Sequence, residues 1–379
     1  MPKTALTTHP SRSTLLSGGA GVRCFATVAE ARAAGWDDLP TGAPFSSCEW
    51  LQAFTPTALG GAGGPAATLL TLRSAGDERV RAVLQRLPVA RMRLGDAVDP
   101  AWVACGLGST AYQFGQALFS GPAHASTAPP TVTAALLAEA ASRLGHEGAW
   151  LLKDLPVGTP APAGWVEVPA LPEMAMAIPE RWRSFDDYLA DLPSKYRRRA
   201  RRARAKLAGL ERRPLSATEA ERFGDSLTAR YADLMARTPY APFVVEDGYV
   251  ARLKALRPDE VALTGYFDGG RLVGFSTLLC DGGEGLAHLA AVDPAYNPTH
   301  QLYLNLLLDL LDAAIGRRCR RLNYGRTATT IKSSIGAQPV QYVSFVRHTG
   351  RFRHQLLRPL VSRVLSPTDR DAQIQRPLG

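Results

Sequence analysis

A stretch near the C-terminus, LNYGRTATTIKSSIGAQP, combines a strand-like start, a glycine and two cations. Asn323, Tyr324 and Arg326 alternate around the predicted strand end, so Tyr324 faces away from its two neighbours. Gly325 permits a sharp exit from the strand, and Lys332 falls on a short predicted helix. Arg326 suits bidentate contact with a carboxylate or phosphate, and Lys332 supplies a point charge. These two cations either bind an anionic reactant together, or they take part in an ion pair with an acidic side chain that closes the sheet edge.

A second group of cations lies in SKYRRRARRARAKL, residues 194–207. Its apolar residues Tyr196, Ala200, Ala203 and Leu207 have the spacing of a narrow helical stripe. We therefore predict a helix with one docked face and a wide basic surface. That surface either contacts phosphate groups, on tRNA, a phosphopantetheine carrier or anionic lipid, or neutralises nearby acids. Those acids are Asp186, Asp187 and Asp191.

The elements that must position these residues are clearest in the second half. A short strand precedes an amphipathic helix, for which Thr218 is the predicted N-cap and Glu221 completes a capping box. A second helix and a hairpin around Asp268-Gly269-Gly270 follow. A third strand then leads into a long helix at 298–316, with Asn297 able to cap it. Because this helix joins two strands as a crossover, it predicts local parallel pairing in a mixed sheet.

The whole chain is predicted to be α/β, with two domains, because 379 residues exceed one ordinary core. In the first half, PFSSCEWLQAF starts a helix that Ser46 or Ser47 can cap, and strands and a helix follow. The similar order of elements in the halves suggests two copies of one fold. The predicted parts are a disordered tail at 1–20, domains at 21–172 and 173–350, and a tail at 351–379.

Composition limits the function classes. The hydrophobic content of 46% and charged content of 21% are those of a soluble globular chain. The net charge of +10 fits an anionic partner, although arginine-rich, alanine-rich chains are also basic through genome composition. The longest apolar run carries Asn305, Asp309 and Asp312, so we expect a buried helix and no integral membrane span.

The cysteines and the N-terminus point to a reducing compartment. Five cysteines without a CxxC motif argue against a disulfide framework and against a metal site. The first residues contain no apolar segment of the kind found in secretory signals. We therefore expect a cytoplasmic protein with no bound metal.

Three stretches of the second half resemble the GNAT superfamily of acyltransferases, in the branch of the Fem-type peptidyltransferases. They are RSFDDYLADLPSKYRRRARRARAKL, DGGRLVGFSTLLCDGGEGLAHLAAVDPAYNPTHQLYLNLLLDLL and LNYGRTATTIKSSIGAQP. The resemblance covers roughly residues 180–350 and implies two GNAT-like domains. One departure matters: DPAYNPTHQ stands where ordinary GNAT enzymes carry an Arg/Gln-x-x-Gly-x-Gly/Ala pyrophosphate loop. The resemblance therefore implies another donor, or a donor held differently.

Acyl transfer to an amine requires that both reactants are held in line. It also requires a group that accepts the proton of the amine, and a hydrogen-bond donor that stabilises the developing oxyanion. His288, in the third strand and flanked by Asp293, either serves as the base or is a hydrogen-bonded core histidine. Tyr303, in the first turn of the long helix, either donates to the leaving thiolate or only packs. Lys332 is a further catalytic candidate.

The remaining site residues fall into two groups. The predicted donor- or anion-binding residues are Arg326, Lys332, Asn323, Arg198 and Arg202. The aromatic, proline-rich loop TPYAPFVVEDGY, residues 238–249, is expected to form a wall or lid for the acceptor. The predicted acceptor pocket consists of Tyr240, Phe243, the tyrosine that follows Gly265 (Tyr266) and Tyr324.

These features predict an N-acyltransferase that forms an amide with the amine of a small metabolite or natural-product intermediate. The donor would be acyl-CoA or an acidic acyl-carrier protein, with no tightly bound cofactor. Two alternatives stay open: an aminoacyl-tRNA-dependent amide-forming transferase, which the basic helix would serve, and a non-catalytic binding protein on the same fold.

Overall fold

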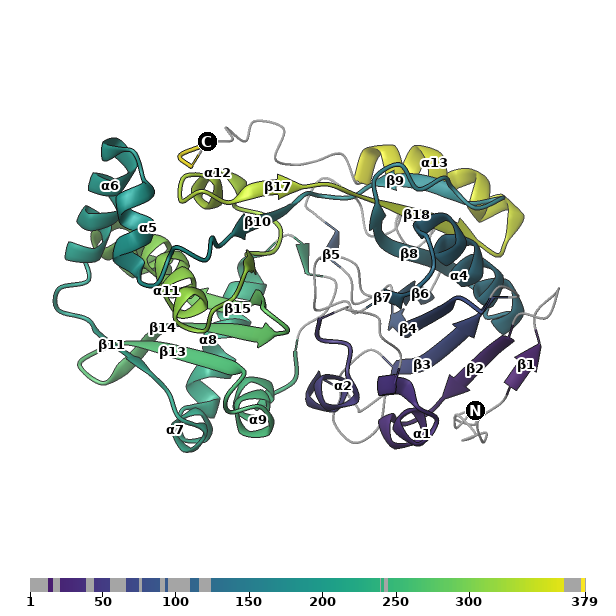
Figure 1. Cartoon of the computed structure of the whole chain (residues 1–379), viewed down its shortest axis with the longest axis horizontal. Helices are drawn as coiled ribbons and strands as arrows, with labels where there is room; N and C mark the ends of the chain where they lie inside the picture. Colours follow the sequence, from purple (N-terminus) through teal and green to yellow (C-terminus); the bar gives the residue numbers. More distant parts are fainter. Residues whose placement is uncertain are drawn as a thin grey trace. The chain divides into compact units, whose positions relative to one another are not determined.

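The chain divides into two compact units (Figure 1). The computed structural model describes residues 13–15, 21–38, 44–54, 66–74, 77–88, 93–94, 110–115, 124–238, 240–241, 245–364 and 376–378. Unit 1 comprises residues 1–117, 121–170 and 342–366. Unit 2 comprises residues 118–120, 171–341 and 367–379. Each unit contains a mixed sheet with helices on it, which confirms the predicted α/β class.

Unit 2 is built on a sheet with the strand order β11-β13-β14-β15-β16-β10-β17. β15 and β16 are parallel, and the other neighbouring strands are antiparallel. The crossover helix α11 joins the parallel pair, as the sequence predicts. The strands of this sheet are β10 (Glu173–Ala177), β11 (Glu211–Pro214), β13 (Val261–Asp268), β14 (Arg271–Asp281), β15 (Glu284–Val292), β16 (Arg321–Asn323) and β17 (Gln338–Val340). The short strand β12 (Tyr240–Ala241) lies outside it.

Helices cover both faces of this sheet (Figure 1). α11 packs on β14 and β15, with α5 and α6 against it, while α8 and α9 pack on the other face. Arg204 at the end of α6 reaches Asp309 of α11, which holds these two layers together. The helices are α5 (Phe185–Asp191), α6 (Ser194–Ala205), α7 (Ala217–Arg222), α8 (Gly224–Arg237), α9 (Tyr249–Leu256), α10 (Asn297–His300), α11 (Leu302–Gly316) and α12 (Thr329–Ser333).

The helix that follows β11 begins earlier than predicted. Ser216, not Thr218, is the N-cap of α7, and Glu219, not Glu221, completes the capping box. Both pairs have the same spacing, so the sequence pattern alone does not choose between them. The chain leaves β11 at Pro214, and the earlier serine is the first cap available.

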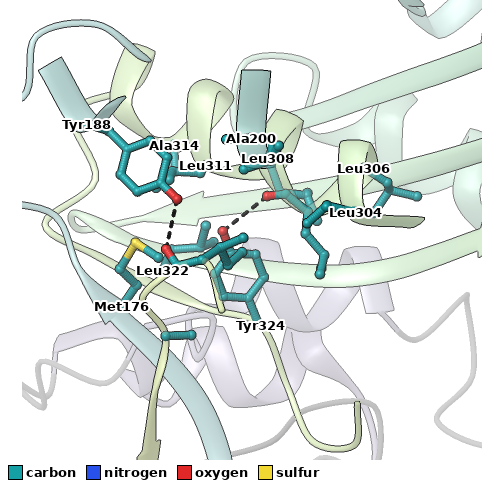
Figure 2. Packing of buried hydrophobic residues seen from close by; sticks show 14 of the residues in the cluster. Met176, Tyr188, Ala200, Leu304, Leu306, Leu308, Leu311, Ala314, Leu322 and Tyr324 are labelled. Carbon is teal, nitrogen blue, oxygen red and sulfur yellow. Dashed lines mark hydrogen bonds between the residues drawn. The ribbon is translucent and has the colours of Figure 1, made fainter. Parts of the chain in front are cut away.

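Helix α11 forms the centre of the unit 2 core because it lies between the sheet and α6. Its buried residues include Leu304, Leu306, Leu307, Leu308, Leu311 and Ala314. Two buried tyrosines cross this core (Figure 2): Tyr188 donates to the carbonyl of Ile335 at 2.9 Å, and Tyr324 donates to that of Leu307 at 3.1 Å. Burying each leucine contributes about 2 kcal/mol, so α11 is a main source of the unit's stability.

The predicted helix at 298–316 is interrupted at Gln301, whose φ is +46°. This left-handed residue separates α10 from α11. Asn297 still acts as a cap, as predicted, but for the second segment: its side-chain oxygen accepts from the backbone N–H of Tyr303 at 3.1 Å. Asn297 thereby satisfies one of the amides left open at a helix N-terminus.

Unit 1 has a sheet of strand order β1-β2-β3-β4-β6-β8-β18-β9, with β7 paired to β4. β6 and β8 are parallel and are joined by α4, the same crossover as in unit 2. The described elements are β1 (Ser13–Leu15), β2 (Gly21–Phe25), α1 (Val28–Ala33), α2 (Cys48–Phe54), β3 (Ala66–Arg73), β4 (Arg79–Pro88), β5 (Arg93–Leu94), β6 (Thr110–Phe114), β7 (His124–Ser126), α4 (Pro130–Leu144), β8 (Ala149–Pro156), β9 (Val166–Pro169), β18 (Tyr342–His348) and α13 (Arg351–Val364).

Two of the predicted domain limits differ from this division. β18 pairs with β8 and β9 in the unit 1 sheet, although the prediction assigned it to the second domain. The predicted tail at 351–379 contains α13, which packs on β18 and β9. Periodicity identifies such elements but not the sheet in which a strand pairs. Of the predicted tail at 1–20, β1 pairs with β2, and the rest lies outside the described residues.

Candidate active site

The parallel strands of unit 2 separate at the site. β15 and β16 pair at Glu284–Arg321, Gly285–Leu322 and Leu286–Asn323, and within the described chain this ladder goes no further. β15 runs on to Val292, whereas the chain after β16 stays with β10. The divergence of two parallel strands beyond their carboxyl-terminal pairing is a typical place for a ligand in an α/β sheet.

Lys332 of α12 lies at the carboxyl end of β16. Its Nζ donates to the carbonyl oxygens of Arg326 at 2.7 Å and Gly325 at 3.3 Å. The side chain is buried, and this burial lowers its pKa from 10.5 to about 7. A neutral amine has two N–H groups and one lone pair. The two carbonyls can take both N–H groups, which leaves the lone pair to accept a proton.

The loop that supplies those carbonyls has an unusual backbone. Gly325, Thr327 and Ala328 all have positive φ, at +70°, +65° and +48°. The two non-glycine residues cost of the order of 1 kcal/mol each in this region. Such strain is concentrated at functional sites, and here it directs carbonyl groups toward the lysine.

The predicted anion-binding cluster is brought together only in part. Lys332 donates to the backbone carbonyl of Arg326, and among the described residues it makes no ion pair with an acid at the sheet edge. Asn323 is buried, and its side-chain oxygen accepts from the N–H of Gly325 at 2.7 Å. Asn323 therefore shapes the turn after β16.

His288 lies in β15 beside α9, where its Nε2 is 2.8 Å from the hydroxyl of Tyr249. Burial lowers the pKa of His288 to about 3. A group with this pKa is a weak proton acceptor near neutrality. Half-buried and bonded to Tyr249, His288 is thus better suited to a structural hydrogen bond than to the predicted role of base. Tyr249 was absent from the predicted site, and no sequence motif connects it to His288.

The other two catalytic candidates also have defined surroundings. Asp293 accepts a hydrogen bond from the N–H of Ala295 at 3.1 Å and so caps the turn after β15. Its carboxylate also lies 3.5 Å from Arg230 of α8 and from Arg271 of β14, and it links these two elements. Tyr303 is half-buried, and burial raises the pKa of its phenol to about 12. The phenol therefore keeps its proton near neutrality and can donate a hydrogen bond.

Helix α6 docks as predicted. Ala200 and Ala203 are buried, with Tyr196 and Leu207 packed against the same core. Arg204 turns inward to the buried carboxylate of Asp309, which also accepts from Arg212 and, at 2.5 Å, from the hydroxyl of Tyr266.

The outer face of α6 remains cationic. Arg198 and Arg202 are exposed and have no ion pair with any residue the structure describes. Two of the acids expected to neutralise the helix are engaged elsewhere: Asp187 in the capping box of α5, and Asp191 with Arg181. This surface can therefore contact an anionic partner.

Two residues of the predicted acceptor pocket have a defined place in the structure. Tyr266 and Tyr324 are buried core residues that donate to Asp309 and Leu307. Phe243 and the side chain of Tyr240 lie outside the described residues. Across the described ranges, the structure has no group of three or more His, Cys, Asp or Glu residues placed to hold a metal ion. Nor does any helix in those ranges have the length and apolar character to span a bilayer.

Residues 194–333 match the family model of the acetyltransferase (GNAT) domain. No curated protein matches the chain at a significant level. Among solved structures, FemX matches with a TM-score of 0.50 and 10% identity, over 89% of this chain and 99% of its own. A tandem GNAT protein from the clavulanic acid biosynthesis pathway gives a TM-score of 0.46 and 15% identity, over 87% and 99%.

A third structure, the C-terminal domain of a protein from Agrobacterium fabrum named as a lysylphosphatidylglycerol synthetase, gives a TM-score of 0.49 and 11% identity, over 90% and 98%. At such identities the likeness is one of fold. Residues 194–333 thus have the sequence pattern of an acetyltransferase (GNAT) domain, within the larger α/β unit 2.

Proposed function

We propose that the protein forms an amide by transferring an acyl group from a thioester to the amine of a small metabolite or natural-product intermediate. The observation that carries this proposal is Lys332, buried where β15 and β16 separate and with a pKa of about 7. General base catalysis is most effective when the pKa of the base lies near the working pH.

In the proposed reaction, the neutral amine of Lys332 accepts a proton as the substrate amine attacks the thioester carbonyl. A C–N bond forms, the C–S bond breaks, and the thiolate leaves. Tyr303, still protonated near neutrality, would donate a hydrogen bond to the developing oxyanion or to the leaving sulfur. The lysine returns its proton to the thiolate, so no further reactant is needed.

We propose that the acyl donor is bound by the basic helix α6 as well as by the N-terminus of α11. There the N–H of Tyr303 is already bonded to Asn297, so this amide is not available to a pyrophosphate. The basic helix lies next to this junction: Nδ1 of His300 is 2.8 Å from the carbonyl of Lys206, and Asn305 donates to that of Ala203 at 2.7 Å. This arrangement supports a donor on an anionic macromolecule, either an acidic carrier protein or, as the second candidate function, an aminoacyl-tRNA.

The test is to incubate the protein with an amine mixture and, separately, with acyl-CoA, acyl-carrier protein and charged tRNA. Mass spectrometry then detects amide products. We expect product from one carrier class, and less than a tenth as much (~10-fold or more lost) with Lys332→Met. Product only from charged tRNA would establish the second candidate. No product from any donor, together with retained donor binding, would favour the non-catalytic alternative.

A further inference from the structure

Unit 2 brings two cysteines together that are 39 residues apart. Sγ of Cys319 lies 3.5 Å from Sγ of Cys280. Cys280 is near the end of β14 and half-buried, whereas Cys319 lies between α11 and β16 and is buried. Neither cysteine has a part in the proposed acyl transfer.

The backbone fixes the position of Cys319. Arg318 has a φ of +58°, and its N–H donates to Ile315 at 2.9 Å, while the N–H of Cys319 donates to Ala314 at 3.0 Å. This is the Schellman pattern at a helix C-terminus, in which the second residue past the cap packs against the helix. The turn therefore directs the thiol of Cys319 toward the sheet.

The sheet makes room for this thiol at Gly285. A Cβ there would lie 3.3 Å from Sγ of Cys319, a tight contact. Gly285 is also the strand partner of Cys280 on β14. On the other side, the N–H of Cys280 donates to the carbonyl of Glu260 at 2.9 Å, which holds its backbone in place. Both thiols are thus positioned by ordered backbone.

We propose that Cys280 and Cys319 are a site of reversible disulfide formation that fastens the end of α11 to β14. Closing the present 3.5 Å gap to a bonded distance of about 2.05 Å requires the two sulfurs to approach by about 1.5 Å. Side-chain rotation of two neighbouring residues can supply such a movement without rearrangement of the sheet.

The oxidant is a small disulfide such as oxidised glutathione. The hydrogen bond with Cys319 and burial raise the pKa of Cys280, so this thiol must first lose its proton to solvent, which its partial exposure permits. The Cys280 thiolate then attacks one of the glutathione sulfurs, forms a mixed disulfide and releases one glutathione. The thiolate of Cys319 then attacks Sγ of Cys280 and releases the second. Two protein thiols are oxidised, one glutathione disulfide is reduced to two thiols, and the two protons pass to them.

The hydrogen bond with Cys280 lowers the pKa of Cys319, and nearby Arg317 acts in the same direction. Cys319 is therefore suited to the second, intramolecular attack. The bond would enclose β15, α10 and α11 in one covalent loop. It restricts the unfolded chain, so the melting temperature should rise by several degrees.

The experiment treats the full chain with oxidised glutathione, blocks remaining thiols and digests it with trypsin without reduction. Trypsin releases Cys280 in the peptide 272–317 and Cys319 in the dipeptide 319–320. We expect the large peptide to carry the mass of the dipeptide, the melting temperature to rise, and dithiothreitol to reverse both changes. Cys24→Ala should keep the linkage, and Cys280→Ser should lose both changes.

Two outcomes would overturn the proposal. One is alkylation of both cysteines after oxidation of the wild-type chain. The other is glutathione retained on Cys280, since a resolving Cys319 would have displaced it. Both are read on the wild-type protein, so they do not depend on whether a cysteine variant folds.

Discussion

Nζ of Lys332 donates a 2.7 Å hydrogen bond to the carbonyl oxygen of Arg326 from a side chain that is 3% exposed. Its burial has an effect on stability as well as on the proposed chemistry. Between its folded pKa of about 7 and its ordinary value of 10.5, the unfolded chain binds a proton that the folded chain does not. Stability linked to this group therefore increases as the pH rises through that window.

Replacing Lys332 by Met should lower turnover more than tenfold while the fold is kept. The wild-type rate should increase with pH up to about 7, because only the neutral amine accepts a proton. Lys332→Arg is the matched control: it keeps the charge but stays protonated, so it should be as inactive as Met. Steady-state rates from pH 5 to 9 test this, and a Met variant with the wild-type rate would contradict the assignment. Urea titrations should also show the wild-type stability rising relative to Lys332→Met above pH 7.

His288 should affect stability in acid and leave the rate profile unchanged. Its folded pKa of about 3 lies below the ordinary value of 6.5. As the pH falls from 6.5 to 3, the unfolded chain therefore gains a proton first, and stability decreases. His288→Gln should flatten this decrease in urea titrations. Tyr249→Phe, which removes the 2.8 Å hydrogen bond, should cost about 1 kcal/mol. A shift of the rate profile in His288→Gln would restore the histidine as the base.

Asp309 should be a strong contributor to the stability of unit 2. Its buried carboxylate accepts from Arg204, Arg212 and Tyr266. Asp309→Asn leaves the two arginine contacts without a negative charge to pair with. The free energy of unfolding, measured with urea, should therefore fall by about 3 kcal/mol. Asp312→Asn, on the same helix and half-buried, should cost less than about 1 kcal/mol. Equal losses of unfolding free energy in the two variants would show that the hydrogen bonds to Asp309 add no stability beyond that of an ordinary acid on α11.

The basic face of α6 should give salt-dependent binding of the donor carrier. A double variant with Ala at Arg198 and Arg202 removes two exposed cations. For a tRNA donor it should reduce the slope of log affinity against log salt by about 1 to 2. Arg237→Ala, exposed at the end of α8, is the matched control and should leave the slope unchanged. Filter binding at several salt concentrations measures it, and identical slopes in all three proteins would exclude α6 as the contact.

Ending the chain after Gln341 should destabilise unit 1, although residues 1–117 and 121–170 of this unit are kept. The truncation removes β18, which lies between β8 and β9. Those two strands would then expose unpaired backbone groups along their length. We expect faster proteolysis within residues 124–170 and loss of the cooperative transition of unit 1. Resistance equal to that of the full chain would show that unit 1 folds without this strand.

Much of unit 2 follows from local sequence signals. The Asp268-Gly269-Gly270 turn places a hairpin, and the stripe of Tyr196, Ala200, Ala203 and Leu207 predicts how α6 docks. The crossover helix implies the parallel pair β15–β16. These features depend on periodicity and turn residues within one segment, which the chain carries wherever the segment packs.

Other features depend on contacts between distant segments. Which capping box starts α7 depends on where β11 ends. The hydrogen-bond partner of His288 is Tyr249, which comes from a distant helix that no local motif connects to the histidine. Arg204 and Arg198 look equivalent in sequence, yet only Arg204 meets Asp309.

By itself, the sequence determined the fold class, the GNAT-like arrangement and the presence of Lys332 beside a strand end. Only the tertiary structure decided that this lysine is buried on two carbonyl groups, that β18 completes the unit 1 sheet, and that Cys280 meets Cys319. The physical reason is that pKa values, hydrogen-bond partners and thiol distances are set by burial and long-range packing, which residue spacing along the chain does not record.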